Sequence, residues 1–147
     1  MKLILGVEDI LYGHAHGDGG DPNTTTGDVA QFLEAKYSVM EEFYKLHEND
    51  VVEILSDSIG DAVADCLAGM SFDIDNISDE ISGEIKKLFQ TAILTKEFDG
   101  KIDGVATQAS LGGVSHRKKK GFHRKKAVRP SFLDTHLYYS SFKVWIE

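Results

Sequence analysis

Three potential metal ligands stand close together near the start of the chain. His14, His16 and Asp18 form an H-x-H-x-D string, in which two imidazoles and one carboxylate could bind a transition metal. The surrounding stretch is rich in glycine, and the sequence offers no matching cluster of ligands elsewhere. We therefore predict a mobile polar loop over residues 13–28, and we predict neither a metal nor a cofactor.

A second cluster is basic and could bind an anionic surface. Half of the 16 Lys and Arg fall between residues 117 and 129 without any Asp or Glu among them. They are Arg117, Lys118, Lys119, Lys120, Arg124, Lys125, Lys126 and Arg129. Such a segment could dock on the acidic body of a neighbouring copy, contact the phosphates of a nucleic acid, or remain a solvated tail. The rest of the chain holds all 24 acidic residues, which favours docking between identical copies.

Catalytic motifs are missing from the sequence. It contains no nucleophile elbow, phosphate-binding loop, dinucleotide fingerprint or paired-histidine zinc helix. The adjacent carboxylates Glu41 and Glu42 fall on the polar side of a predicted helix. Cys66 is the single cysteine, which excludes an internal disulfide and favours a reducing cytoplasm, and its apolar helical neighbours predict that it is buried. We predict that the protein is not an enzyme.

Three amphipathic helices are predicted between residues 28 and 96. Asp28 and Gln31 resemble a capping box at the start of the first, the sequence HEND at 47–50 separates it from the second, and Ser78 is the predicted N-cap of the third. None is apolar all round, so each helix needs the others to bury its stripe. The stripes are Val29, Phe32, Leu33, Tyr37, Met40, Phe43 and Tyr44; then Val52, Leu55, Ile59, Ala62, Val63, Cys66, Leu67 and Met70; then Ile77, Ile81, Ile85, Leu88, Phe89, Ala92 and Ile93.

Short strands are predicted near both ends of the chain. Residues 3–7 read LILGV, and residues 138–146 alternate between two faces. Repeated glycine turns between the third helix and this last strand predict an extended arm. We expect one α+β, mainly α domain, in which residues 1–96 form the helical body and residues 97–147 form the arm and the C-terminal strand.

The segment RPSFLDTHLYYSSFKVWIE, which begins at Arg129, carries a resemblance. It is similar to the C-terminal pattern R-P-x-F-x-D-T-G-L-Y-x-x-S-F-x-x-W of small virion proteins from long-tailed bacteriophages. The matching residues are Pro130, Phe132, Asp134, Thr135, Leu137, Tyr138, Ser141, Phe142 and Trp145. His136 stands where that pattern has glycine. The resemblance implies a structural virion protein of the neck or tail, such as a tail-completion or head–tail joining subunit, built as a ring of identical copies.

Such a ring would give the C-terminal strand a partner. An unpaired strand edge is an aggregation hazard in a monomer, so we expect the strand to pair with a neighbouring copy, with the basic arm as its tether. The predicted strand interface is Phe132, Asp134, Leu137, Tyr138, Phe142, Val144, Trp145 and Ile146. Expected partners are further copies, adjacent neck, portal or tail proteins, and DNA passing through the channel, but no membrane. Expected locations are the virion and, during assembly, the host cytoplasm. The alternative is a nucleic-acid-binding accessory protein that uses residues 117–129 on phosphates.

Overall fold

The computed structural model describes residues 2–12, 23–71, 73–107, 110–111, 128–133 and 136–146. The fold is α+β and mainly helical, as predicted. Its elements are β1 (Leu3–Val7), α1 (Thr26–Tyr37), α2 (Val39–Leu67), α3 (Ile74–Leu94), α5 (Leu137–Ser141) and β2 (Phe142–Ile146). Several predicted site residues lie outside the described ranges, namely His14, His16, Asp18, Asp134 and every residue of the basic cluster except Arg129.

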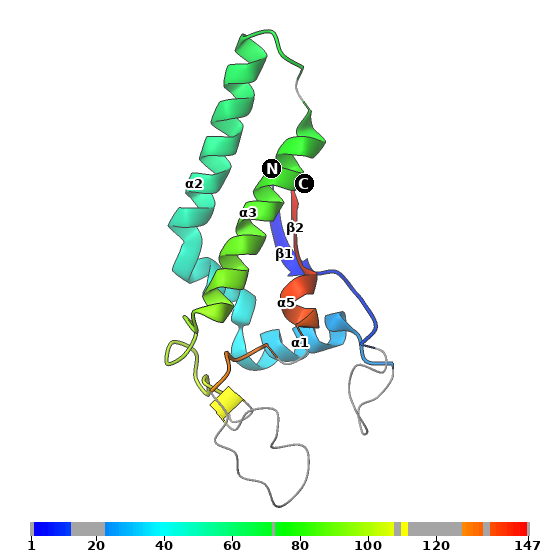
Figure 1. Cartoon of the computed structure of the whole chain (residues 1–147), viewed down its shortest axis with the longest axis vertical. Helices are drawn as coiled ribbons and strands as arrows, with labels where there is room; N and C mark the ends of the chain where they lie inside the picture. The colour runs from blue at the N-terminus through cyan, green and yellow to red at the C-terminus, as the bar shows by residue number, and fades with distance from the viewer. Residues whose placement is uncertain are drawn as a thin grey trace, which may run out of the picture.

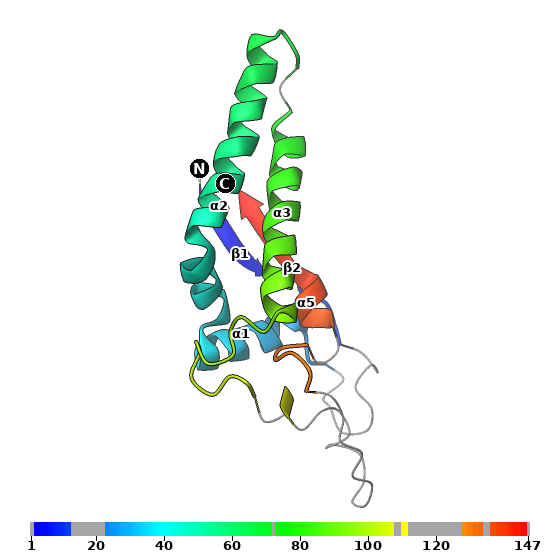
Figure 2. The same ribbon diagram turned by 60° about the vertical axis from the view of Figure 1, so that its left-hand side comes forward.

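A long helical hairpin gives the molecule its shape. Helices α2 and α3 run antiparallel beside each other, and α1 crosses below their lower end, which we call the foot (Figure 1). The strands β1 and β2 lie along the lower half of the hairpin (Figure 2). Above the sheet, the hairpin continues as two helices that no other described element covers.

The two strands pair with each other within the chain. They are antiparallel, and the register runs from Leu3 opposite Ile146 to Val7 opposite Phe142. The predicted C-terminal strand is too long, because residues 137–141 form the short helix α5. Tyr138 and Ser141 are both buried and lie three positions apart, which is the spacing of one face of a helical turn. The alternation of apolar residues that predicts a strand is thus confined to the residues after Ser141.

The core lies where α2, α3 and β2 meet. The rings of Phe89 and Phe142 stack with centroids 4.0 Å apart, and Phe43 meets Phe89 edge-on at 5.1 Å. The predicted stripe of the third helix is confirmed, since its buried residues are Ile81, Ile85, Phe89, Ala92 and Ile93. The last strand is therefore part of the core of its own chain.

Two helices begin earlier than predicted. Thr25, and not Asp28, is the N-cap of α1, and Asp28 is the second member of a capping box with Thr25. The hydroxyl of Thr26 accepts from the amide of Ile10 and donates to the carbonyl of Glu8, which fixes α1 to the end of β1. Asp73, and not Ser78, caps α3 by accepting from two backbone amides. In both cases several polar residues precede the buried part of the stripe, and an earlier one than predicted is the cap.

The break between the first two helices also differs from the prediction. It lies at Ser38, which adopts a left-handed φ of 48°, while the carboxylate of Glu34 accepts from the amides of Met40 and Glu41 at 2.9 and 3.2 Å. The predicted break at HEND is only a kink in α2 at His47. Both ring nitrogens of His47 lie 2.7 Å from carboxylate oxygens, those of Asp50 and Glu97. These contacts hold the kink, and the helix continues through it.

Residues 97–107 are packed and do not form an extended arm. Phe98, Ile102 and Val105 are buried at the foot of the hairpin. The predicted glycine turns are present, since Gly100 and Gly104 have positive φ angles. These turns fold the apolar residues between them back onto the core, so the segment belongs to the body.

Candidate subunit-contact surfaces

The predicted strand interface is largely internal to the chain. Tyr138, Phe142 and Val144 are each 3% exposed or less, because β2 pairs with β1 and packs on α3. A neighbouring copy therefore cannot reach the side chains of Phe142 and Val144 without unfolding the sheet. Trp145 is 37% exposed and remains a candidate for contact. Phe132, Leu137 and Ile146 are partly buried.

Positions of the C-terminal pattern have conformational reasons in this fold. His136 has a φ of 63°, a left-handed conformation that glycine adopts at little cost, and glycine is the residue of the pattern at this position. Trp145 lies over Gly6 of β1, where a Cβ atom would come within 2.8 Å of its ring. The pattern thus specifies how the last segment packs onto the first strand.

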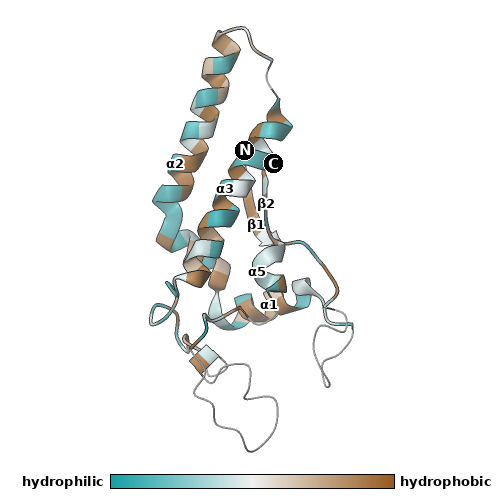
Figure 3. Ribbon diagram, in the orientation of Figure 1, coloured by the Kyte–Doolittle hydropathy of each residue, from teal (hydrophilic) through white to brown (hydrophobic). Residues whose placement is uncertain are grey.

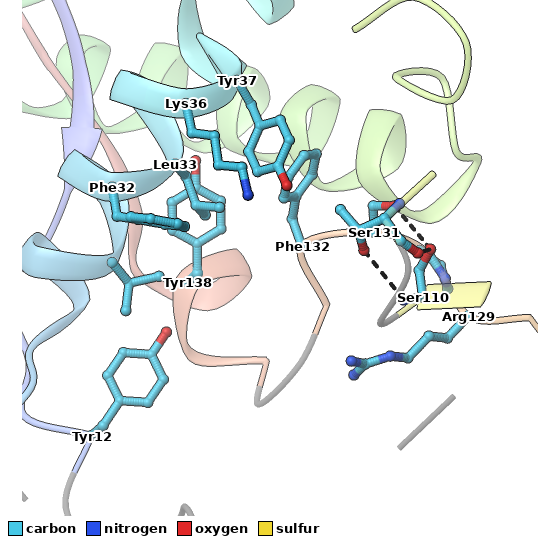
Figure 4. Close-up of a pocket in the computed structure, with 13 residues that line it drawn as sticks. Tyr12, Phe32, Leu33, Lys36, Tyr37, Ser110, Arg129, Ser131, Phe132 and Tyr138 are labelled. Carbon is cyan, nitrogen blue, oxygen red and sulfur yellow. Dashed lines mark hydrogen bonds between the residues drawn. The ribbon is translucent and has the colours of Figure 1, made fainter. Parts of the chain in front are cut away.

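An aromatic cavity of about 410 Å³ opens beside α1 at the foot of the molecule. Figure 4 shows aromatic side chains from four segments of the chain around it, with two cations among them. Its aromatic and basic lining residues are Tyr12, Phe32, Tyr37, Phe132, Tyr138, Lys36 and Arg129. The ammonium of Lys36 lies 4.9 Å from the ring centroid of Tyr37 and 5.5 Å from that of Phe32. Such a cavity can accept an apolar or aromatic side chain next to an anionic group.

Tyr138 forms an inner wall of this cavity. Its hydroxyl is buried and has no hydrogen-bond partner among the described residues. Burial raises the pKa of Tyr138 above its ordinary value of 10.0, and the nearby charge of Glu34 adds to this effect. The phenol is therefore neutral at physiological pH, and it does not act as a base in the cavity.

A second surface is an exposed apolar row on the upper hairpin, which we call the hairpin stripe. It consists of Val52, Ile59, Val63 and Leu67 of α2, which are 51%, 39%, 52% and 85% exposed. Met70 and Ile74 add exposed apolar area at the turn between the helices. The alternation of apolar and polar residues along α2 is visible in Figure 3.

The sequence predicts that this row is buried, and the structure corrects that prediction. The residues share one helical face, but the sheet that would cover it ends half-way up the hairpin. Cys66 is likewise exposed. Gly60 also faces open space, because a Cβ atom at this position would meet no described atom within 4 Å apart from its own helical backbone and chain neighbours. The helix α2 ends at Leu67, and Gly69 follows with a left-handed φ of 82°.

The hairpin is strongly acidic. Residues 48–85, which make up most of it, contain eleven Asp and Glu and no Lys, Arg or His. The described segments that flank the basic residues 117–126, namely residues 110–111 and 128–133, lie at the foot (Figure 1). The carbonyl of Val128 accepts from Nζ of Lys96, just after the end of α3.

Other kinds of site find no support in the described ranges. They contain no group of three His, Cys, Asp or Glu side chains placed to hold a metal ion. None of their helices combines the length and the apolar character needed to cross a membrane. The sequence reasoning missed the aromatic cavity, because its lining comes from segments far apart in the chain. The aromatic residues of the C-terminal pattern were the only available signal.

Comparison with known proteins adds no assignment. No protein-family model matches the chain, and neither a curated protein nor a solved structure does. The functional argument therefore rests on these surfaces and on the resemblance of the C-terminal segment.

Proposed function

We propose that the protein is a structural subunit of a tailed-bacteriophage virion, which forms a ring of identical copies in the neck or tail and joins head to tail. The observation that carries this proposal is the hairpin stripe. Four apolar side chains on one helical face of α2 are exposed, and a surface of this kind is typical of a chain that completes its packing in an assembly.

The charge distribution supports assembly through unlike surfaces. Residues 48–85 are strongly acidic and residues 117–129 are basic, so identical copies attract each other when these two parts meet. Contacts between unlike surfaces generate a ring when the rotation between copies closes. The resemblance of the C-terminal segment to phage neck and tail proteins supports the same kind of assembly.

The second candidate is a nucleic-acid-binding accessory protein. It is favoured by one observation, the density of the basic cluster, whose residues could neutralise several phosphates. Binding to short duplex DNA that falls steeply between low and moderate salt would support this candidate. A salt-sensitive oligomer that forms without DNA would support the virion subunit.

Two measurements test the proposed function. Sedimentation velocity over a range of protein concentrations should show a discrete ring mass in place of a monomer. Quantitative mass spectrometry of purified particles, from a phage that carries this gene, should find the protein at a fixed, ring-sized copy number. Absence from the particles would refute the proposal whatever the oligomeric state in solution.

A further inference from the structure

We propose that residues 112–127 of one copy dock on the hairpin stripe of the next copy. This inference rests on the proposed function, because it requires that copies of the chain assemble. It names the two surfaces that meet: an apolar face of an acidic helix, and a basic segment of the neighbouring chain.

The receiving surface is continuous with a groove beside the sheet. A cavity of about 370 Å³ lies between β1 and α2, lined by Leu3, Leu5, Tyr44, Val51, Val52 and Leu55. Val52 belongs to both the groove and the hairpin stripe, so the apolar surface runs from the edge of β1 up the bare part of α2. A segment laid along this path would cover the face that the short sheet leaves open.

The charge of the helix that carries the stripe determines which partner it fits. Glu48 lies one turn before Val52 on the stripe face of α2, and residues 48–67 contain no Lys, Arg or His. Two hairpins packed stripe to stripe would bring two acidic helices together, and their repulsion disfavours that arrangement. The stripe therefore fits a partner that combines apolar and positively charged side chains.

Residues 112–127 have that chemistry. They include seven of the eight residues of the basic cluster, no Asp or Glu, and Phe122 in the middle. Their charge complements the eleven acidic residues between positions 48 and 85. Phe122 supplies an aromatic side chain for the apolar row.

Chain length prevents the last basic residues of the segment from reaching the top of their own hairpin. The flanking residues are held together at the foot, since the amide of Arg129 donates to the carbonyl of Ser110 at 3.3 Å. Arg124 is four positions from Val128 and thus within about 14 Å of it, even fully extended. The 21 residues of α3 rise about 31 Å from the foot to the top of the hairpin. Arg124, Lys125 and Lys126 therefore cannot reach Leu67 of their own chain.

A peptide-binding experiment tests this contact directly. A fluorescein-labelled peptide of residues 115–127 is titrated with the full-length protein in which Lys118, Lys119, Lys120, Lys125 and Lys126 are replaced by Gln, so that the chain's own segment competes less. Fluorescence anisotropy should show saturable binding that weakens with added salt. Adding Val63→Ser and Leu67→Ser should weaken binding at least tenfold. The matched control, Leu11→Ser with Leu94→Ser, replaces two exposed leucines outside the stripe and should leave binding unchanged.

Two further variants separate the charged and apolar parts of the contact. Glu48→Gln and Glu53→Gln together, beside Val52 at the lower end of the stripe, should weaken binding and flatten its salt dependence. A peptide with Phe122→Ser should bind less tightly at every salt concentration. All protein variants should retain the helical circular dichroism of the parent, since the altered side chains are exposed.

The outcomes distinguish this contact from the proposed function. Equal affinity of the peptide for the stripe variant and for its matched control would overturn the inference. So would a peptide that does not bind the protein, or one that binds duplex DNA but not the protein. If wild-type chains still form rings in sedimentation velocity, any of these results removes only this contact and leaves the virion proposal intact. Loss of binding that is confined to the variants of the stripe and of its neighbouring acidic residues supports the proposed contact.

Discussion

The phenol of Tyr138 links burial to the alkaline limit of stability. Its hydroxyl has no partner among the described residues, and burial raises its pKa above 10.0. In the unfolded chain the phenol ionises near pH 10, whereas in the folded chain it keeps its proton. The folded state therefore binds more protons above this pH, and its stability falls as the pH rises.

We predict that Tyr138→Phe removes this loss. At pH 8 the variant should be within about 1 kcal/mol of the wild type or more stable, because it removes a buried hydroxyl that lacks a partner among the described residues. Between pH 8 and pH 10.5 the wild type should lose more stability than the variant. Urea unfolding followed by circular dichroism at the two pH values measures the difference. Equal losses in the two proteins would contradict the assignment.

His136 is a second residue whose backbone carries a cost. Its φ of 63° is left-handed, which is unfavourable for a side chain with a Cβ atom. We predict that His136→Gly stabilises the fold by about 0.5–1 kcal/mol, after the larger entropy of glycine in the unfolded chain is subtracted. His136→Ala keeps the Cβ and is the control, so it should show no gain. Urea midpoints of the three proteins decide, and a matching gain in the alanine variant would point to the imidazole instead.

The strand β2 has a structural role that the sequence alone does not reveal. From the sequence we expect this strand to pair with a neighbouring copy, whereas the structure stacks Phe142 on Phe89 in the core of the same chain. We predict that Phe142→Ala costs about 3–5 kcal/mol, while Lys143→Ala on the exposed face of the same strand costs less than about 0.5 kcal/mol. Removal of residues 142–147 should abolish cooperative unfolding. A truncated chain that unfolds like the wild type would restore the idea of an exchanged strand.

Local patterns predicted some elements well and others poorly. The stripe of α3 and the strand β1 could be predicted because burial of one face imposes a period along the sequence. The helix starts at Thr25 and Asp73 could not, because several polar residues near each start can act as a cap. The kink at His47 depends on Glu97, which lies 50 positions away, and no local pattern contains that contact.

The hairpin stripe shows the limit of sequence patterns for a candidate site. Ile59 and Val63 have the helical spacing of a buried face, and this spacing is the same whether their cover comes from the same chain or from another. Among the described residues, the length of β1 and β2 determines how far up α2 the chain covers itself. The sequence could thus predict an apolar face but not its exposure, and this exposure is what makes it a candidate site.

For the whole molecule, the division of charge defines a direction. The acidic residues 48–85 lie along the hairpin, whereas the described residues on either side of the basic segment lie at the foot, so the chain presents unlike surfaces. We predict that an assembly held by such surfaces is weakened by salt, because the Debye length falls from about 30 Å at 0.01 M to about 8 Å at 0.15 M ionic strength. Sedimentation velocity at the two ionic strengths measures the change. The apolar part of the contact should persist at higher salt.

The pairing of β1 with β2 also has a consequence for synthesis on the ribosome. Val7 and Phe142 are paired, although about 135 positions separate them. At about 5–20 residues per second, β1 emerges roughly 7–30 s before its partner strand is made. During that interval the helices can form, but the core lacks Phe142 and Val144 and one strand edge is open. The nascent chain therefore passes through a stage at which a chaperone, or the β1 strand of a neighbouring nascent chain, competes with its own last residues.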